Sequence, residues 1–392
     1  MTRYAFVFFS LLLIAGCRKS EQHNPAYYDC NLNFTDSSLS NPRNSDYQSL
    51  LNSITKDGVV GIMMSVYQPQ AGTWLGTSGS ADLHNNIAMQ ACNITRVGST
   101  VKLFTATTIL KLKEEGKLGL DDKIADYLHG DMINKIENAD KATIRQLLQH
   151  SSGIYNYIQN LNFQTASLND LIKEWHPDEL LRYAYNKKAY FKPGDDVRYS
   201  NTGYILLGLL IEKIEGKPFY KVFEEKIFNP LGLTMTRFAA EDHIPDGIAR
   251  GYIDLYGKFQ VIESTQYSGW DYYTADGGLI SNPYDLSVFF QALMAGNIIS
   301  TASINEMLTW KTPKNFDADY FPIQYGLGIF KIETPEGVAY THSGDAIGYY
   351  ANMLYFPDDK TTIVYAVNSN YGKIDQLVSS KEAVGKIISV VR

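Results

Sequence analysis

Hydrophobic and polar positions divide the chain into stretches of different periodicity. The first stretch carries apolar residues at helical spacing, namely Tyr47, Leu50, Leu51 and Ile54. Gly58 follows where such a helix would stop, so the pattern predicts an amphipathic helix. Residues 59–67 and 73–80 then have the composition of strands, and a Gln-Pro-Gln-Ala-Gly turn separates them. We therefore expect a β-hairpin directly after the helix.

The middle of the chain is helical and rich in loops, and the last third returns to strands. After a helix beginning at Ser99, further helices are expected at 144–149, 170–185, 202–215 and 285–294. Strands are expected at 326–332, 338–341, 349–356 and 361–368, followed by a closing helix over 374–390. Strands at both ends of the chain predict one sheet built from distant parts of the sequence. The helices between them, roughly residues 118–295, predict a second lobe.

Composition narrows the functional class. The chain has 392 residues, of which 45% are hydrophobic, enough to bury a large core. Its net charge of −7 is spread along the sequence without a block rich in Lys or Arg, which argues against nucleic acid as a partner. The chain has no spaced set of His, Cys and Glu residues and no Gly-rich phosphate loop between a strand and a helix. We therefore expect neither a metal site nor a cofactor.

The N-terminus has the pattern of a targeting segment. Arg3 is followed by a short apolar run over 5–14, too short to span a bilayer, so residues 1–16 are interpreted as a signal peptide. The run ends in Leu-Ile-Ala-Gly-Cys, which resembles the lipobox of bacterial lipoproteins. That resemblance implies lipidation of Cys17 and a membrane-anchored protein of the cell envelope, facing outside the cytoplasm. Ordinary signal cleavage near Gly16 is the alternative.

A polar segment separates this leader from the globular body. Residues 17–44 are rich in Asn, Ser, Asp and Gln, which is typical of a tether, and residues 45–392 form the predicted catalytic domain. Cys30 and Cys92 would both lie outside the cytoplasm, where a disulfide is permitted. A Cys30–Cys92 disulfide and two unpaired thiols both remain open.

The pattern Ser-x-x-Lys occurs twice. One turn of helix separates its two residues, so the hydroxyl and the amine project from the same face. Ser53 and Lys56 stand at the end of a predicted helix, where both are ordinary surface residues. Ser99 and Lys102 instead open a long helix, whose free N–H groups favour developing negative charge. A serine needs a neighbouring base to become nucleophilic, and Lys102 is placed to be one. The alternative for Ser99 is a simple helix N-cap.

Several collinear segments between residues 50 and 370 resemble the serine β-lactamase and penicillin-binding superfamily. The nearest group is the class C-like branch, which includes DD-carboxypeptidases and esterases. The matching segments are Arg-Val-Gly-Ser-Thr-Val-Lys at 96–102, Leu-Leu-Gln-His-Ser-Ser-Gly at 147–153, Phe-Lys-Pro-Gly at 191–194, Tyr-Ser-Asn at 199–201, Asn-Pro-Leu-Gly-Leu at 229–233, Gly-Gly-Leu at 277–279 and His-Ser-Gly at 342–344. The resemblance implies an α/β fold in which an antiparallel sheet is flanked by helices beside a mostly helical second lobe.

The resemblance also assigns roles to individual residues. Ser99 would be the nucleophile, and Lys102 would help to deprotonate it. Tyr199 would pass the proton to the leaving group, and Asn201 would orient the substrate amide. A nearby ammonium group would lower the pKa of Tyr199. The alternative for Tyr199 is a buried tyrosine that packs before a helix.

The third motif begins with His342. In the family it lines the cleft edge together with Ser343, and Gly344 allows a ligand to approach closely. The backbone N–H groups of Ser99 and Asp345 would form the oxyanion hole. Most β-lactamases carry Lys where this chain has His342, so a permanent positive charge for a β-lactam carboxylate is missing. The alternative is a strand-end histidine bonded locally.

Other candidate residues have structural interpretations. His150 lies in a segment that shapes the helical lobe in the family, and Gly277 and Gly278 are interpreted as backbone-geometry residues. A set of aromatic residues either lines the cleft or packs within the lobe; these are Tyr155, Tyr157, Tyr267, Trp270, Tyr272 and Tyr273. The predicted function is hydrolysis of amide or ester bonds through a Ser99 acyl-enzyme. A D-Ala-D-Ala carboxypeptidase or a D-amino peptidase leads, with a small peptide or ester as substrate. Esterase, β-lactamase and a catalytically silent binding lipoprotein are the alternatives.

Overall fold

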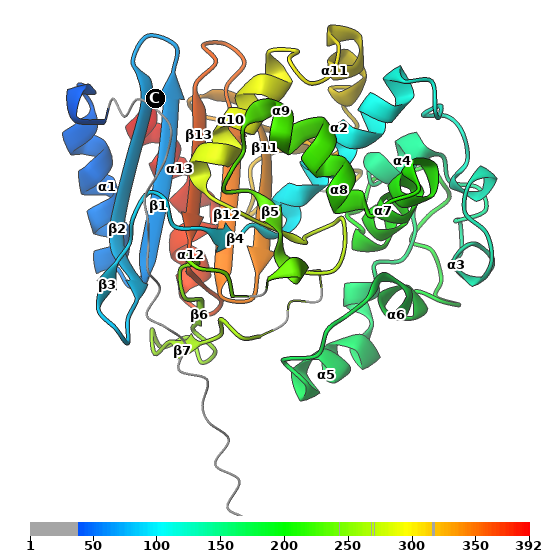
Figure 1. Ribbon diagram of the computed structural model, residues 1–392, viewed down its shortest axis with the longest axis horizontal. Helices are drawn as coiled ribbons and strands as arrows, with labels where there is room; N and C mark the ends of the chain where they lie inside the picture. The colour runs from blue at the N-terminus through cyan, green and yellow to red at the C-terminus, as the bar shows by residue number, and fades with distance from the viewer. Residues whose placement is uncertain (1–37, 243, 268, 270, 316–317) are drawn as a thin grey trace, which may run out of the picture.

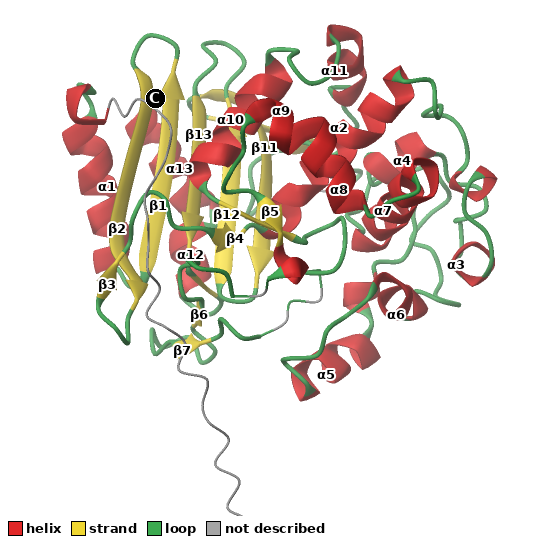
Figure 2. Cartoon of the chain, viewed as in Figure 1, coloured by secondary structure: helices red, strands yellow, loops and turns green. Residues whose placement is uncertain are grey.

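An eight-stranded antiparallel sheet forms the centre of the molecule (Figures 1 and 2). The computed structural model describes residues 38–242, 244–267, 269, 271–315 and 318–392. The strand order is β3-β2-β1-β13-β12-β11-β10-β9, so the two ends of the chain meet where β1 pairs with β13. The strands are β1 (Gly61–Gln68), β2 (Gly72–Asp82), β3 (Ile87–Ala88), β9 (Ile323–Tyr325), β10 (Phe330–Thr334), β11 (Gly337–Ala346), β12 (Tyr349–Tyr355) and β13 (Thr362–Val367). The prediction of one sheet built from distant parts of the sequence is confirmed.

The sheet separates two hydrophobic cores. On one face pack α1 (Asn44–Lys56), α12 (Ile374–Val378) and α13 (Lys381–Val391), and on the other pack α2 (Val101–Glu114) and α10 (Pro283–Met294). Side chains alternate along each strand, so in β13 Ile363 and Tyr365 enter the first core while Val364 and Ala366 enter the second. Burial on both faces explains why these strands are continuous apolar runs in the sequence.

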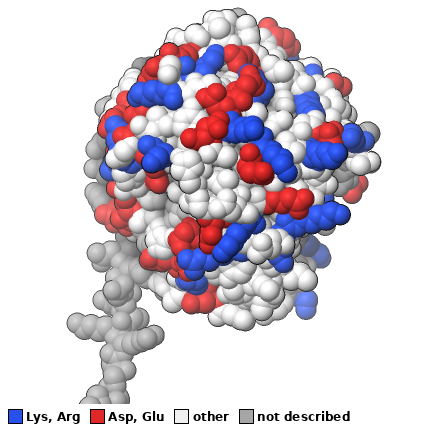
Figure 3. Space-filling model, turned by 90° about the vertical axis from the view of Figure 1, so that its right-hand side faces the viewer, with Lys and Arg blue, Asp and Glu red and all other residues white. Residues whose placement is uncertain are grey.

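Most helices between β4 and β9 form a lobe beside the sheet, on the right in Figure 1, whereas α10 lies on the sheet itself. Its further helices are α3 (Asp131–Asn134), α4 (Ile144–Leu148), α5 (Leu161–Asn169), α6 (Pro177–Arg182), α7 (Asn201–Glu215), α8 (Phe219–Phe223), α9 (Asn229–Leu231) and α11 (Thr301–Met307). Two small sheets join lobe and body, formed by β4 (Thr95–Arg96), β8 (Leu279–Ser281) and β5 (Arg237–Phe238), and by β14 (Ser369–Asn370), β6 (Tyr252–Ile253) and β7 (Ile262–Glu263). Acidic and basic side chains are interspersed over the face of this lobe (Figure 3).

Several predicted boundaries were wrong, among them those of the strands expected at 326–332 and 338–341, which are Phe330–Thr334 and Gly337–Ala346. The helix expected at 170–185 is only α6, because Pro177 occupies its first turn and His176 forms a capping box with Glu179. The closing helix is broken into α12 and α13, since Ser380 caps α13 by accepting from the Ala383 N–H at 3.1 Å. The tether does not extend to residue 44, because Ser38 is already buried and its hydroxyl bonds the Leu75 backbone.

Several predictions concern residues that the structure does not describe. The signal peptide, Cys17 and Cys30 all lie outside the described residues. Cys92 takes part in a disulfide, so the alternative of two unpaired thiols was wrong for Cys92, while the other alternative, a Cys30–Cys92 disulfide, involves a residue outside the described ones. Among residues 38–392, apart from the positions excepted above, no helix is both long enough and apolar enough to cross a membrane.

Candidate active site

Ser99 lies in the 3₁₀ turn η2 (Gly98–Thr100), which leads directly into α2. Its side chain is half-buried, and its Oγ is 2.8 Å from the Nζ of Lys102, one helical turn further on. Neither Val97 nor Thr100, the residues at the two N-cap positions of η2 and α2, makes a side-chain cap. The hydroxyl of Ser99 therefore faces the lysine, and the N-cap alternative was wrong.

Lys102 is completely buried. Its Nζ donates to the backbone carbonyl of Asp276 at 2.7 Å and lies 3.7 Å from the Oδ2 of that residue. Burial lowers the pKa of Lys102 to about 8, against the opposing effects of Asp276 and Asp271. A fraction of the lysine is thus a free amine near neutral pH, and a free amine can accept the proton of Ser99.

Tyr199 stands before α7 with its ring beside both groups. The Lys102 Nζ lies 5.1 Å from the ring centroid, and the Ser99 side chain hydrogen-bonds the phenol. Burial raises the pKa of Tyr199 well above its ordinary value, so the expected lowering by the nearby ammonium group was wrong. The phenol therefore keeps its proton in the resting site. Of the two residues, Lys102 is better suited to be the base and Tyr199 to be the proton relay.

His150 supports the ring of Tyr199. The two rings stack with centroids 4.4 Å apart, and the Nδ1 of His150 accepts from the Ser200 N–H at 3.1 Å. His150 is buried with its backbone in the left-handed region, at a φ of 57°. Burial lowers its pKa well below the ordinary value, so the imidazole is neutral. This placement fits the structural role predicted for His150.

Two glycines allow β11 to pack backbone to backbone against the turn that carries Ser99. A Cβ on Gly344 would lie 2.1 Å from the Val97 carbonyl oxygen and 2.5 Å from the Ser99 nitrogen. A Cβ on Gly98, whose φ is 47°, would lie 2.4 Å from the Asp345 carbonyl oxygen. Contacts this short exclude any side chain. The predicted oxyanion donors, the N–H groups of Ser99 and Asp345, therefore belong to two segments in direct contact.

His342 is buried within β11 and lines the cleft. Its Nδ1 lies 2.7 Å from the Ser343 carbonyl oxygen, which can only accept, so Nδ1 carries the proton. Burial and the nearby Lys102 lower the pKa of His342 to about 3. The third motif consequently presents a neutral ring. The contact with the Ser343 carbonyl confirms the alternative of a locally bonded histidine. His342 also lines the cleft.

Asp345 presents a carboxyl group to the cleft from the end of β11. Although its side chain is exposed, the protein around it displaces enough water to raise its pKa to about 7. Asp375 adds to this effect and a hydrogen bond with Asn370 opposes it. Near neutral pH, Asp345 is therefore about equally charged and uncharged.

Asn201, the first residue of α7, also lines the cleft. Its backbone N–H and its Nδ2 lie 3.2 and 3.4 Å from the Oδ1 of Asn156. Asn156 itself lines the cleft, and sequence reasoning missed it because a lone Asn carries no motif. The two amides form one polar wall, so the predicted contact of Asn201 with a substrate amide would be shared with Asn156.

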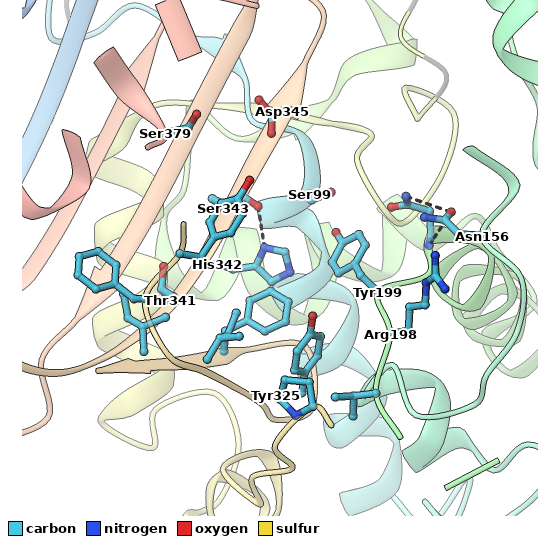
Figure 4. Close-up of a pocket in the computed structure, with 18 of the residues that line it drawn as sticks. Ser99, Asn156, Arg198, Tyr199, Tyr325, Thr341, His342, Ser343, Asp345 and Ser379 are labelled. Atoms are coloured by element: carbon cyan, nitrogen blue, oxygen red, sulfur yellow. Dashed lines mark hydrogen bonds between the residues drawn. The ribbon is translucent and has the colours of Figure 1, made fainter. Parts of the chain in front are cut away.

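The cleft has a volume of about 1010 Å³ and bends around the edge of β11. Strand β10 pairs with β11 only as far as Thr341, so the following residues leave that edge open. Figure 4 shows Arg198 and Asn156 toward one end of the cleft and Asp345 and Ser379 toward the other, with Tyr199 and His342 between them. An extended substrate could therefore reach past Ser99 in both directions.

The aromatic side chains of the cleft are not those proposed from the sequence. Tyr157 and Tyr272 are buried in the cores, and Trp270 lies outside the described residues. The aromatic residues that line the cleft are Tyr190, Phe191, Tyr199, Tyr320, Phe321, Tyr325, Phe330 and Tyr350. Within the described residues, no group of three or more His, Cys, Asp or Glu is placed to hold a metal ion.

Comparison with known proteins identifies the family. The Beta-lactamase family model matches residues 48–380. This chain belongs to the Beta-lactamase family. It is 31% identical to penicillin-binding protein 4* of Bacillus subtilis over 304 residues, which cover 74% of this chain and 64% of the relative. It is also 30% identical to protein flp of Staphylococcus aureus, over 49% of this chain and 37% of that protein. This member of the Beta-lactamase family thus spans less than two thirds of either relative.

Solved structures of similar fold confirm the predicted architecture. D-amino acid amidase from Ochrobactrum anthropi SV3 superimposes with a TM-score of 0.79 at 26% identity, covering 89% of this chain and 98% of the amidase. A D-stereospecific amidohydrolase from Streptomyces has a TM-score of 0.74 at 29% identity, covering 85% and 97%. The chain therefore has the fold that the sequence predicted, shared with serine hydrolase relatives of the Beta-lactamase family.

Proposed function

We propose that this protein is an extracytoplasmic amide hydrolase that works through an acyl-enzyme on Ser99. The observation that carries the proposal is the fully buried Lys102 amine, 2.8 Å from the Ser99 hydroxyl. In acylation, the Ser99 proton moves to Lys102 while Oγ forms a bond to the substrate carbonyl carbon. The C–N bond then breaks, and Tyr199 passes a proton to the departing amine. Water attacks the ester by the same route and releases the acid.

The negative charge on the attacked oxygen needs donors placed in advance. The N–H groups of Ser99 and Asp345 are the proposed pair, and the backbone packing at Gly98 and Gly344 supports it. Donors fixed by backbone contact need no reorganisation during the reaction. Such preorganised donors usually make the largest contribution to stabilising the transition state.

The proposed substrate is an amide of a D-amino acid with a free amino group. The neutral His342 ring offers no fixed positive charge to a substrate carboxylate. The carboxyl group of Asp345, which lines the cleft, would favour a cationic amine. The similar solved structures include a D-amino acid amidase and a D-stereospecific amidohydrolase, which supports D-amino acid amides as the substrate class.

A D-Ala-D-Ala carboxypeptidase is the second candidate. Arg198 and Lys381 line the same cleft, and either could bind the terminal carboxylate of such a peptide. Esterase and β-lactamase activities would use the same chemistry and rank below these two candidates. The lipobox-like segment ending at Cys17 supports a lipid-anchored protein of the cell envelope, in contact with peptidoglycan-derived peptides.

A substrate panel tests this proposal. It contains D- and L-phenylalanine amide, a peptide ending in D-Ala-D-Ala, a short-chain p-nitrophenyl ester and a chromogenic cephalosporin, each assayed for kcat/KM. We expect the D-amide to be cleaved fastest, at least about tenfold faster than its L-enantiomer, since enantiomers place different groups at the acyl carbon. Preference for the D-Ala-D-Ala peptide would favour the second candidate.

Two serine variants give the panel its controls. Ser99→Ala should abolish turnover and covalent labelling by a fluorophosphonate in intact-mass spectra, whereas Ser53→Ala should change neither. Turnover that survives in Ser99→Ala would contradict the assignment of the nucleophile. A wild-type protein that neither turns over nor labels would be the silent binding lipoprotein.

A further inference from the structure

Two buried aspartates lie behind the catalytic lysine, on the segment that leads into β8. Asp276 is 1% exposed and touches Lys102 twice, through its carbonyl oxygen at 2.7 Å and through Oδ2 at 3.7 Å from Nζ. Asp271 is 5% exposed, and its carboxyl group lies directly over Gly277, where a Cβ would come within 1.8 Å of Oδ2. Asp276 thus contacts the lysine directly, and Asp271 is near enough to affect its charge.

The hydrogen bonds of Thr274 show how a proton fits in this cluster. Its hydroxyl lies 2.9 Å from the Asp271 carbonyl oxygen and also contacts the Oδ1 of Asp276. One hydroxyl has one proton to donate. Both contacts are satisfied together only when Thr274 donates to the carbonyl and a protonated Asp276 donates to Thr274. When Asp276 is ionised, Thr274 donates to its Oδ1 instead, so the same side-chain arrangement serves Asp276 with or without its proton.

The other groups facing Lys102 carry no charge. Tyr199 and Tyr204 present their rings at 5.1 and 5.6 Å, and burial keeps the pKa of each phenol well above 10. His150 and His342 are neutral because their pKa values are lowered. Among the described residues that affect the charge of Lys102, the two aspartates are the anions. Burial raises the pKa of both, that of Asp271 to about 7.

We propose that Asp276, supported by Asp271, is a positioning residue that holds the Lys102 amine against Ser99 and sets the strength of that amine as a base. The ionised carboxylate stabilises the ammonium that forms when Lys102 takes the Ser99 proton. Burial alone would make the lysine a much weaker base. This inference rests on Lys102 acting as the base in the proposed function, and it does not depend on which amide is cleaved.

The test measures how fast a fluorophosphonate modifies Ser99 between pH 5 and pH 10. In this reaction an Oγ–P bond forms, the P–F bond breaks, fluoride leaves and the serine proton goes to Lys102. We expect Asp276→Asn to move the acidic limb of the profile about one pH unit or more to lower pH and to lower the plateau. Asp271→Asn should shift the limb the same way by less. A limb that stays within 0.2 unit of wild type (on the order of assay error) in both variants would overturn the proposal.

A third aspartate provides the matched control. Asp285 is also buried, and its carboxylate accepts from the Met235 N–H at 2.9 Å and from Thr236, away from Lys102. Asp285→Asn should lower thermal stability and leave the limb unmoved, so a merely structural effect is distinguished from an effect on the base. A wild-type protein that the fluorophosphonate never modifies would overturn the proposed function, and this inference with it.

A measurement on the wild-type protein covers variants that fail to fold. The ¹³Cε resonance of Lys102, assigned by its loss in Lys102→Arg, can be followed through a pH titration by NMR. Because burial lowers the pKa of Lys102 to about 8, we expect the resonance to titrate well below pH 10, and coupling to the aspartates should broaden the transition. A single inflection above pH 10 would contradict the proposal.

Discussion

The two Ser-x-x-Lys sequences of this chain differ far more in their lysines than in their serines. Ser53 and Ser99 are both half-buried, so access to the hydroxyl does not distinguish them. Ser53 donates to the Leu50 carbonyl at 2.8 Å and accepts from Lys386 at 3.1 Å on the surface, while Lys56 points to solvent. Lys102, by contrast, is sealed from water. Burial of the amine, and not the spacing of the motif, thus distinguishes the proposed nucleophile from the surface serine.

Burial matters here through solvation. An exposed ammonium keeps its water shell and stays charged at neutral pH, so it cannot take a proton from a hydroxyl. Lys102 has lost that shell, and its remaining partners are a carbonyl, a hydroxyl and carboxyl groups. Its pKa of about 8 follows from this loss.

Replacing each lysine with alanine should give the largest difference in activity between the two motifs. Lys102→Ala removes the base and should lower kcat/KM for the D-amide by roughly 100- to 10,000-fold, the range of general-base contributions. Lys56→Ala should leave kcat/KM unchanged. Circular dichroism establishes that both variants fold. A loss of less than tenfold in Lys102→Ala would assign the base elsewhere.

The pH profile of the wild-type protein tests whether Lys102 is the base without any substitution. Lys102 must be uncharged to accept the Ser99 proton, so activity should rise with pH and level off above the lysine pKa of about 8. Well below that pH, each unit should cost about tenfold in kcat/KM. A profile that is flat between pH 6 and pH 9 would show that no group with such a pKa acts as the base.

Gly344→Ala tests the backbone contact that only Ser99 has. The added methyl would lie 2.1 Å from the Val97 carbonyl oxygen, and that oxygen belongs to backbone that cannot swing aside. We expect a loss of roughly 1–3 kcal/mol in the free energy of unfolding, together with slower fluorophosphonate labelling of Ser99. Gly337→Ala is a control on the same strand, because its Cβ would meet only the ends of side chains, at 3.9 Å, although its φ of 125° carries some strain. Equal labelling rates in the two variants would contradict the argument.

Removing the surface partner of Ser53 should have the smallest effect. Lys386→Ala breaks an exposed contact, and exposed contacts of this kind contribute between zero and about 1 kcal/mol. The melting temperature should therefore change little and kcat/KM not at all. A clear loss of activity would mean that the second Ser–Lys contact has a role after all.

The sequence predicted those parts of the fold that depend on local patterns. The apolar spacing predicted α1, and the apolar runs predicted β1, β12 and β13. Each of these strands is buried on both faces, so its sequence is largely apolar. Ser99, Lys102 and Tyr199 could be located because several segments resemble the family and occur in the same order along the chain. Helix ends such as the break before Ser380 were missed, because a single capping serine decides them.

The parts of the site that the sequence did not predict depend on contacts between distant residues. Asp271 and Asp276 belong to no motif, and only the folded chain brings them to Lys102. The direction of the pKa shift of Tyr199 was wrong for the same reason, since burial outweighs the neighbouring lysine. Of the two alternatives left open for the aromatic residues, packing is correct for Tyr157 and Tyr272, which enter the cores.

The packing of η2 against β11 joins residues that lie far apart in the chain, since Gly98 touches Asp345 and Lys102 bonds the carbonyl of Asp276. A partly synthesised or misfolded molecule lacks one or both of these contacts, so its Ser99 is an ordinary alcohol. We therefore expect reactivity toward a fluorophosphonate only after the last strands have docked. The same probe that tests catalysis would therefore count, molecule by molecule, how much of a preparation has completed folding.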